Sequence, residues 1–262
     1  MFVKERWEKI IASLYQNGSV RVKELAEQFQ VSEDCIRKDL AALEKDGQLK
    51  RSYGGAVLEK INVHKEDVSQ RINVNTPQKQ KIAREALKLL QDGDMVFLDI
   101  STSNIEVAKE IIRQHKKVHV VTNMVEVMRV FQTSCEAVLT FLGGSFNRGK
   151  DGFIGSLTVE QIQNFRFDIA FLGVVGIDPY QNSVNTYVLE DGYTKKAVLS
   201  CTRKAYMLCE GSKFEQEGNY RYAGLDSFTG IILDEKPKKD LEKALKNYEL
   251  NIYYCLLYTS DA

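Results

Sequence analysis

The residues best suited to chemistry follow a short apolar segment in the middle of the chain. Asp99 is followed, after one apolar residue, by three hydroxyl side chains and an amide: Ser101, Thr102, Ser103 and Asn104. If these residues lead from a strand into a helix, backbone N–H groups and the positive end of the helix dipole face a ligand, and the hydroxyls can also donate. That chemistry suits a phosphate. The same residue types also form an ordinary helix N-cap, so both interpretations stay open.

Catalysis would need a positioned carboxylate base and often a second acid. Asp99 and Asp178 follow strand-like segments and are the candidates, although aspartate at a strand end is also a common cap, and Asp178 precedes a proline in a turn-like sequence. His64, His115 and His119 lack metal-ligand spacing, and the sequence has no P-loop and no nucleophile with a partnered base. We therefore expect no catalytic residue, metal or cofactor, and keep an isomerase or deaminase as the alternative.

Strand-like and helix-like segments alternate from about residue 79 onward. The sequence predicts strands at 95–100, 118–122, 137–142, 168–175, 205–209 and 229–233, and helices at 79–90, 104–114, 124–132, 190–202 and 238–248. Apolar strands separated by helices are typical of a parallel sheet covered on both faces, so we predict a doubly wound α/β domain. Gly143-Gly144, after one of these strands, can form the wall opposite Ser101 or only a turn.

Three short amphipathic helices and a hairpin are expected in the first fifty-odd residues. The apolar residues at helical spacing are Trp7, Ile10, Ile11 and Leu14, then Val22, Leu25, Ala26 and Phe29, then Ile36, Leu40 and Leu43. Ser32 is a suitable N-cap for the third helix. A helix, a short helix, a turn and a third helix allow the third to enter a major groove. The polar face of that helix is then free to meet DNA.

Cations on this third helix and on the hairpin suit a nucleic-acid contact. Arg37 can read guanine, and Lys38, Lys50 and Arg51 can neutralise phosphates. The charge pattern alone suits a solvated helix face equally well. The segments 20–32, 35–40 and 51–56, however, closely resemble the winged helix-turn-helix of the DeoR family of bacterial transcription regulators. The resemblance implies DNA contacts from Ser32, Cys35, Arg37, Lys38, Lys50, Arg51 and Tyr53. Cys35, Lys38 and Tyr53 stand where the family usually has Thr, Arg and His, which alters the expected operator sequence.

The resemblance continues along the larger part of the chain. The segments that carry it are 92–94, 97–99, 120–123, 142–144, 168–173, 176–178 and 212–214. The family's C-terminal module is similar in fold to ribose-5-phosphate isomerase, glucosamine-6-phosphate deaminase and CoA transferases, and it binds a phosphorylated sugar. The resemblance implies effector contacts from Asp99, Ser101, Thr102, Ser103, Asn104, Gly143, Gly144, Asp178, Glu190, Lys195 and Lys213.

One departure from the family's module affects the effector. The family has Gly-Thr-Thr at positions 101–103, where this chain has Ser101, Thr102 and Ser103. Because serine removes backbone freedom and adds a side chain, phosphate binding is expected to weaken or the ligand to change. A regulator whose sensor no longer binds a small molecule is therefore a further alternative.

Composition limits the other classes of function. The 262 residues carry 36 Lys plus Arg and 36 Asp plus Glu, so any DNA contact must come from a local arrangement of charge. Five scattered cysteines without a C-x-x-C pair favour reduced thiols in a cytoplasm over disulfides or a thiolate zinc site. No apolar stretch is long enough for a membrane span or a signal peptide.

We therefore predict a cytoplasmic bacterial repressor of a carbohydrate operon, released from operator DNA by a phosphorylated sugar. The expected domains are a DNA-binding domain at 1–57, a linker at 58–75, a sensor at 76–253 and a tail at 254–262 that does not resemble a family ending and need not be native. The resemblance also implies a homo-oligomer, a dimer or tetramer, with no membrane partner.

Overall fold

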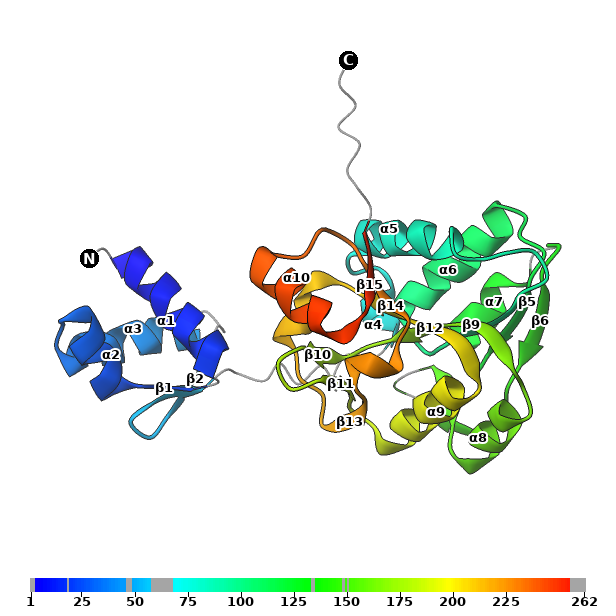
Figure 1. Cartoon of the computed structure of the whole chain (residues 1–262). Coiled ribbons are helices and arrows are strands. Elements are labelled where there is room, and N and C mark those ends of the chain that lie inside the picture. Colours follow the sequence, from blue (N-terminus) through cyan, green and yellow to red (C-terminus); the bar gives the residue numbers. More distant parts are fainter. Residues whose placement is uncertain are drawn as a thin grey trace, which may run out of the picture. The chain divides into compact units, whose positions relative to one another are not determined.

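The computed structural model describes residues 3–17, 19–45, 49–57, 68–132, 135–147, 149 and 151–254. The chain divides into two compact units, Met1–Asn62 and Val63–Ala262, which are described separately (Figure 1). None of the described helices combines the length and the apolar character needed to cross a bilayer.

The small unit has three helices and a three-stranded antiparallel sheet. Its elements are α1 (Val3–Asn17), β1 (Ser19–Arg21), α2 (Val22–Phe29), α3 (Glu33–Lys45), β2 (Lys50–Ser52) and β3 (Gly55–Val57). β3 lies between β1 and β2, so the predicted hairpin gains a third strand that the sequence analysis missed. A Cβ atom on Gly55 would collide with the carbonyl of Val20 in β1, so glycine permits this close pairing.

The core of the small unit is built from the predicted apolar stripes. The side chains of Ile10, Leu14, Ile36, Leu40 and Leu43 are fully buried in it.

A buried polar contact also ties α1 to α3. Arg6 Nε donates to Asp39 Oδ2 at 2.5 Å, and Trp7 Nε1 donates to Asp39 Oδ1 at 2.8 Å. Asp39 therefore holds the first helix against the third, on the side away from the polar face of α3.

The large unit is built on a seven-stranded parallel sheet. The strand order is β15-β14-β12-β9-β4-β5-β6, with bounds β15 (Asn251–Tyr254), β14 (Gly230–Leu233), β12 (Thr202–Cys209), β9 (Phe167–Gly173), β4 (Met95–Leu98), β5 (His119–Thr122) and β6 (Val138–Phe141). The predicted α/β class is therefore confirmed. Its central strands are apolar along their length because both faces of the sheet are covered.

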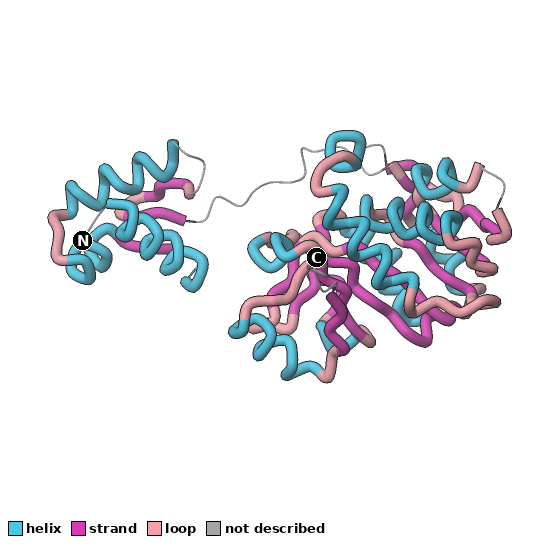
Figure 2. The backbone as a smooth tube through the Cα atoms, turned by 90° about the horizontal axis from the view of Figure 1, so that it is seen from above, coloured by secondary structure: helices cyan, strands magenta, loops and turns pink. Residues whose placement is uncertain are grey.

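Helices pack on both faces of this sheet (Figures 1 and 2). One buried cluster joins the sheet to α4 (Val68–Ile72), α5 (Thr76–Leu87), α6 (Thr102–Arg113) and α7 (Val125–Val130). The other joins it to α8 (Ser156–Gln163), α9 (Leu189–Ser200) and α10 (Lys239–Leu245).

Short elements complete the large unit. A second sheet, order β10-β11-β13, contains β10 (Gly176–Asp178), β11 (Ser183–Thr186) and β13 (Tyr220–Ala223), and a hairpin joins β7 (Ser145–Asn147) to β8 (Gly152–Ile154). The 3-10 helices are η2 (Gly211–Glu215), η3 (Leu225–Ser227) and η4 (Lys246–Tyr248). The second sheet covers the face that also holds α8 and α9.

The predicted linker and tail need correction where the structure describes them. Helix α4 lies inside the segment predicted as a linker, because Val68 is buried against the large unit's core and Lys79 Nζ donates to the carbonyls of Arg71 and Val74 at 2.7 and 2.5 Å. Tyr254, placed in the tail, pairs with Leu233 as the last residue of β15. Residues 58–67 and 255–262, the rest of those two segments, lie outside the described residues.

Candidate functional site

The polar residues of the large unit gather where its parallel strands end. Asp99 follows β4, Asn123 follows β5, Gly143 stands two residues after β6, and Gly173 ends β9. Because the strands are parallel, these residues all lie at the carboxyl edge of the sheet, where α/β proteins bind their ligands.

Asp99 and Lys195 form a buried ion pair at the centre of this edge. Asp99 is fully buried and Lys195 of α9 is 3% exposed. The Lys195 ammonium donates to Asp99 Oδ2, which also accepts from the Gly173 backbone N–H at 2.9 Å. Nζ of Lys195 also lies 3.6 Å from Oδ2 of Asp191, one turn earlier on α9, and Asp191 accepts from Thr186 Oγ1 at 2.6 Å. The Lys195 ammonium thus interacts with two carboxylates.

The charges of this cluster are coupled. Burial lowers the pKa of Lys195, but the charges of Asp191 and Asp99 outweigh burial and raise it above the ordinary value of 10.5. Burial raises the pKa of Asp99, against the attraction of Lys195 and with the repulsion of Asp191. Two carboxylates and one ammonium leave the cluster with an excess of negative charge, so a proton or a donor group is favoured there.

Several buried oxygen atoms near this edge of the sheet have no partner. Among the described residues, Oδ1 of Asp99, Oδ1 of Asn104, Oδ1 of Asn123 and the Tyr222 hydroxyl have no hydrogen-bond partner. The amide nitrogen of Asn104 is used elsewhere: it donates to the carbonyls of Asp99 and Phe171 at 2.9 Å each. Three of the four oxygens are pure acceptors, and buried acceptors call for donors such as the hydroxyl groups of a ligand.

Burial and the nearby Asp99 and Asp191 charges raise the pKa of Tyr222 well above its ordinary value. Its hydroxyl therefore keeps its proton, and it can donate to a ligand as well as accept. The Lys195 ammonium lies 5.9 Å from the centre of the Tyr222 ring.

The predicted hydroxyl loop opens α6 beside this cluster. Ser101 Oγ accepts from the Asn104 backbone N–H at 3.1 Å, so Ser101 caps the helix. Thr102 and Ser103 are buried in the first turn of α6. Ser101 has a φ of −157°, an extended conformation that any residue adopts, so the glycine usual at this position is not required by the backbone.

The predicted glycine wall contacts α8. The Gly143 carbonyl accepts from Thr158 Oγ1 at 2.8 Å and from Gln161 Nε2 at 3.1 Å. Gly144 has a φ of +152°, and a Cβ atom there would collide with the Thr158 hydroxyl. Gly144 therefore allows the end of β6 to lie against this helix, whereas a Cβ atom on Gly143 would meet no other atom.

Three other predicted effector residues belong to different local networks. Asp178 Oδ1 accepts from the backbone N–H groups of Tyr180 and Gln181 at 2.8 and 3.0 Å, so it caps a turn after β10. Lys213 Nζ donates to Gln216 Oε1 at 3.0 Å beside η2. Glu190 is exposed on the outer side of α9.

Sequence reasoning did not single out Asn123, Thr186 and Tyr222. Asn123 follows β5, and Thr186 and Tyr222 lie on β11 and β13, so no spacing along the chain connects them. Asp191 was recognisable, because it stands four residues before Lys195 on the same helix face.

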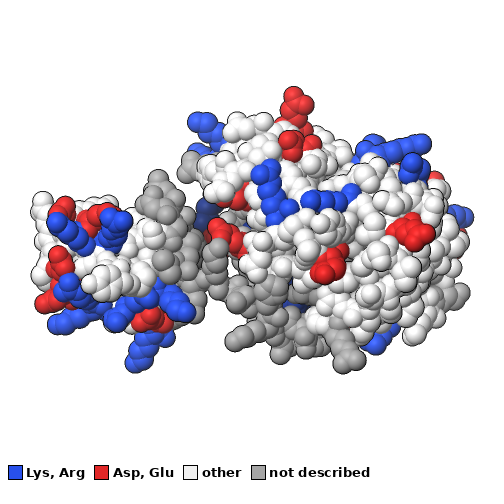
Figure 3. Space-filling model, turned by 90° about the horizontal axis from the view of Figure 1, so that it is seen from below, with Lys and Arg blue, Asp and Glu red and all other residues white. Residues whose placement is uncertain are grey.

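The predicted DNA-reading residues lie at the start of α3 and along it, on β2 and in the β2–β3 turn. Ser32 Oγ accepts from the Cys35 backbone N–H at 3.2 Å, as expected of an N-cap. Arg37 is exposed and pairs with Glu33 and Asp34, each at 2.6 Å. On the face of the small unit seen in Figure 3, basic and acidic side chains are interspersed. Reading DNA through Arg37 thus requires the exchange of exposed ion pairs, each worth up to about 1 kcal/mol.

The other predicted cations of the DNA-binding face are exposed too. They are Lys38 on α3 and Lys50 and Arg51 on β2. Arg51 Nε lies 3.3 Å from Glu44 Oε2. Tyr53 is fully exposed in the turn between β2 and β3, so its aromatic ring faces solvent.

Comparison with known proteins gives matches along most of the chain. Residues 6–62 match the model of the DeoR-like helix-turn-helix domain, and residues 74–235 match that of the DeoR C-terminal sensor domain. The chain is 31% identical to a lactose phosphotransferase system repressor of Lactococcus lactis, covering 81% of this chain and 84% of that protein. It is 27% identical to the glycerol-3-phosphate regulon repressor of Escherichia coli K12, covering 96% and 98%. A ribose 5-phosphate isomerase of Methanocaldococcus jannaschii aligns over 53% of this chain and 54% of its own, with 20% identity and a TM-score of 0.39.

Proposed function

The chain belongs to the DeoR family, and from that premise we propose that it is a transcriptional repressor of a carbohydrate operon, released from operator DNA by a phosphorylated sugar. The relatives named as sugar-system repressors support the regulatory part. The observation that carries the sensing part is the Asp99–Lys195–Asp191 cluster with its unpartnered buried oxygens.

The residue types at this edge suit the two halves of a sugar phosphate. The acceptor oxygens of Asp99, Asn104 and Asn123 suit the hydroxyl groups of the sugar. The first turn of α6, with its backbone N–H groups and the hydroxyls of Thr102 and Ser103, suits the phosphate. A ligand of this kind contributes donors to the oxygens and negative charge to the helix end.

Release from DNA then requires a difference in affinity between two conformations. A ligand shifts an equilibrium only by as much as it binds one state better than the other. A sugar hydroxyl that donates to Asp99 shares this carboxylate with Lys195 of α9, so the bound and free states differ in the position that α9 prefers. The reading helix α3, with Arg37 and Lys38 on its polar face, contacts the operator in the free state.

An operator-release experiment tests this function with the full chain. The operator is selected from random DNA by binding, and fluorescence anisotropy then follows its release as sugar phosphates are added, with free sugars and inorganic phosphate as controls. Asp99→Asn is expected to bind DNA but to lose release by at least tenfold in effector concentration. Asp168→Asn, at the opposite end of β9, is expected to respond normally.

The outcomes separate the alternatives. Failure to enrich any DNA sequence contradicts the repressor function. DNA binding without release by any sugar phosphate favours a regulator whose sensor has lost its ligand. Turnover of a sugar phosphate that Asp99→Asn abolishes would favour the isomerase or deaminase alternative, in which Asp99 is the base.

A further inference from the structure

A groove between α8 and α9 lies on the outside of the large unit. Its volume is about 490 Å³, and its apolar side chains include Val159 of α8 and Ala197 of α9. Three large apolar side chains on the same two helices are exposed: Leu157 (62%), Leu189 (46%) and Tyr193 (53%). Tyr193 lines the groove, whereas Leu157 and Leu189 lie on the two helices that form it. Exposed apolar side chains on the helices of a groove are typical of an interaction site.

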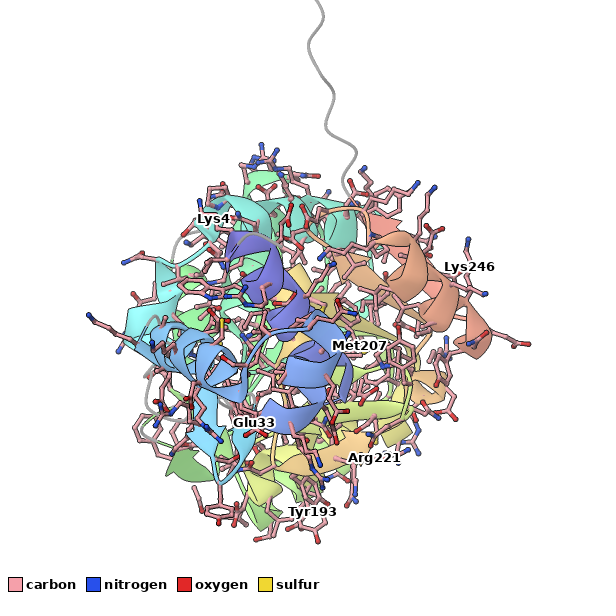
Figure 4. All side chains as sticks on the ribbon, turned by 90° about the vertical axis from the view of Figure 1, so that its left-hand side faces the viewer. Lys4, Glu33, Tyr193, Met207, Arg221 and Lys246 are labelled. Atoms are coloured by element: carbon pink, nitrogen blue, oxygen red, sulfur yellow. The ribbon has the colours of Figure 1, made fainter. Side chains whose placement is uncertain are left out.

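The surroundings of the groove carry few charges. Figure 3 views the α8 and α9 side of the large unit from below, and uncharged side chains cover most of what is seen there. Tyr193 points away from the body of the unit at its outer edge (Figure 4). Its ring lies 6.1 Å from that of Tyr220 on β13, so the aromatic surface continues beyond α9.

Two opposite charges line the groove without an ion pair. Among the described residues, the Glu190 carboxylate has no ion-pair partner, and the Lys196 ammonium contacts only aromatic groups, with its Nζ 2.9 Å from the Tyr220 hydroxyl and 5.0 Å from the centre of the Tyr220 ring. One acidic and one basic group on the same surface make that surface complementary to itself. A two-fold axis through it would bring Glu190 of each copy toward Lys196 of the other.

We propose that a second copy of this chain packs on the α8–α9 groove. The described part of each chain carries one reading helix, α3, and a helix-turn-helix protein reads a two-fold operator by presenting two such helices at a fixed spacing. A self-complementary apolar groove on the large unit provides the surface on which the two copies pair. A partner with charge of a single sign would leave either Glu190 or Lys196 unmatched.

Helix α9 also contributes to the Asp99–Lys195–Asp191 cluster. Asp191 and Lys195 on the inner side of α9 contact the Asp99 network, while Glu190, Tyr193 and Lys196 on its outer side line the groove. A shift of α9 on ligand binding therefore changes the contact between the two copies directly. This link rests on the proposed function, whereas the pairing itself does not.

Sedimentation velocity of the full chain, without DNA or sugar phosphate, tests the pairing. The wild type is expected at a multiple of the 29.8 kDa chain mass, and Leu157→Glu is expected to halve that mass. Val138→Glu, at an equally exposed valine on edge strand β6 (58%), is the control and should leave the mass unchanged. Circular dichroism melting confirms that each variant is folded.

Exchanging the charges of Glu190 and Lys196 gives a second test of the pairing. Glu190→Lys and Lys196→Glu should each weaken self-association at least tenfold, and the double variant should restore most of it, because each charge again meets its opposite across the axis. A monomeric wild type overturns the proposal. So does a Leu157→Glu variant of unchanged mass, or a double variant no better than the single ones. None of these results by itself decides whether the chain binds an operator, which the operator-release experiment measures separately.

Discussion

At the scale of single residues, Lys195 holds a buried charge that must be compensated by its neighbours. A buried ammonium is stable only with partners, and both of its partners are carboxylates that also need it. Removal of the lysine leaves the Asp99 charge buried with the Gly173 N–H as its remaining hydrogen-bond donor among the described residues. The pair therefore acts less as a source of net stability than as a constraint on which groups can enter the site.

We expect Lys195→Met to lower the free energy of unfolding of the chain by about 3–5 kcal/mol, the usual cost of breaking a buried pair from one side. Urea unfolding measures it, with Lys243→Met on the exposed side of α10 as a control that should change stability by less than about 0.5 kcal/mol. Adding Asp99→Asn to Lys195→Met should recover part of the loss.

The pH dependence of that loss has a definite sign. The pKa of Lys195 is raised above 10.5 in the folded chain, so its contribution to stability is fully present below pH 10.5 and is lost as the pH rises beyond that value. The gap in stability between wild type and Lys195→Met should therefore stay constant from pH 7 to about pH 10 and shrink above it. A gap that widens with pH in that range would contradict the assignment.

At the scale of elements, the sequence predicts strands β4, β5, β6, β9, β12 and β14 of the main sheet and most of its helices. Apolar runs such as Phe167–Gly173 are long and buried on both faces, so their composition alone identifies them. Short elements cannot be predicted in this way. β1 and β10 have three residues each, and α4 has five, so none is long enough to show a period.

In the candidate site, too, some residues could be predicted from the sequence and others could not. Ser101 to Asn104 were recognisable because they stand together at a strand end. Tyr222 was not, because it reaches Lys195 from a strand of the second sheet, and only the tertiary fold brings the two together.

The cap of α6 gives a prediction for a whole element. Ser101→Ala removes the acceptor for the Asn104 N–H and should cost about 1 kcal/mol, which lowers the melting temperature by about 2–4 °C. Ser101→Gly, which restores the residue usual in the family, should cost only a few tenths of a kcal/mol. Differential scanning calorimetry distinguishes the two. A larger loss for Ser101→Gly than for Ser101→Ala would mean that the Ser101 Cβ atom stabilises the chain by packing near Gly173, and not that the hydroxyl caps the helix.

At the scale of the whole molecule, DNA and effector binding must be linked in both directions. If a sugar phosphate weakens operator binding by some factor, the operator weakens sugar-phosphate binding by the same factor, for which 5–150-fold is usual. The proposed route runs through α9, from Lys195 inside to the α8–α9 groove outside. The groove is therefore required for the linkage, although it touches neither ligand.

We predict that Leu157→Glu uncouples the two ligands. Calorimetric titration should find sugar-phosphate affinity within twofold of wild type, because Leu157 lies on the outer surface of α8. Operator affinity should fall at least tenfold, because a single copy engages one half-site, and the remaining binding should no longer respond to the effector. Wild type and Val138→Glu, titrated with effector in the presence and absence of operator, should show the full reciprocal factor. If Leu157→Glu kept that factor as a single copy, the conformational change would have to pass from the large unit to α3 within one chain.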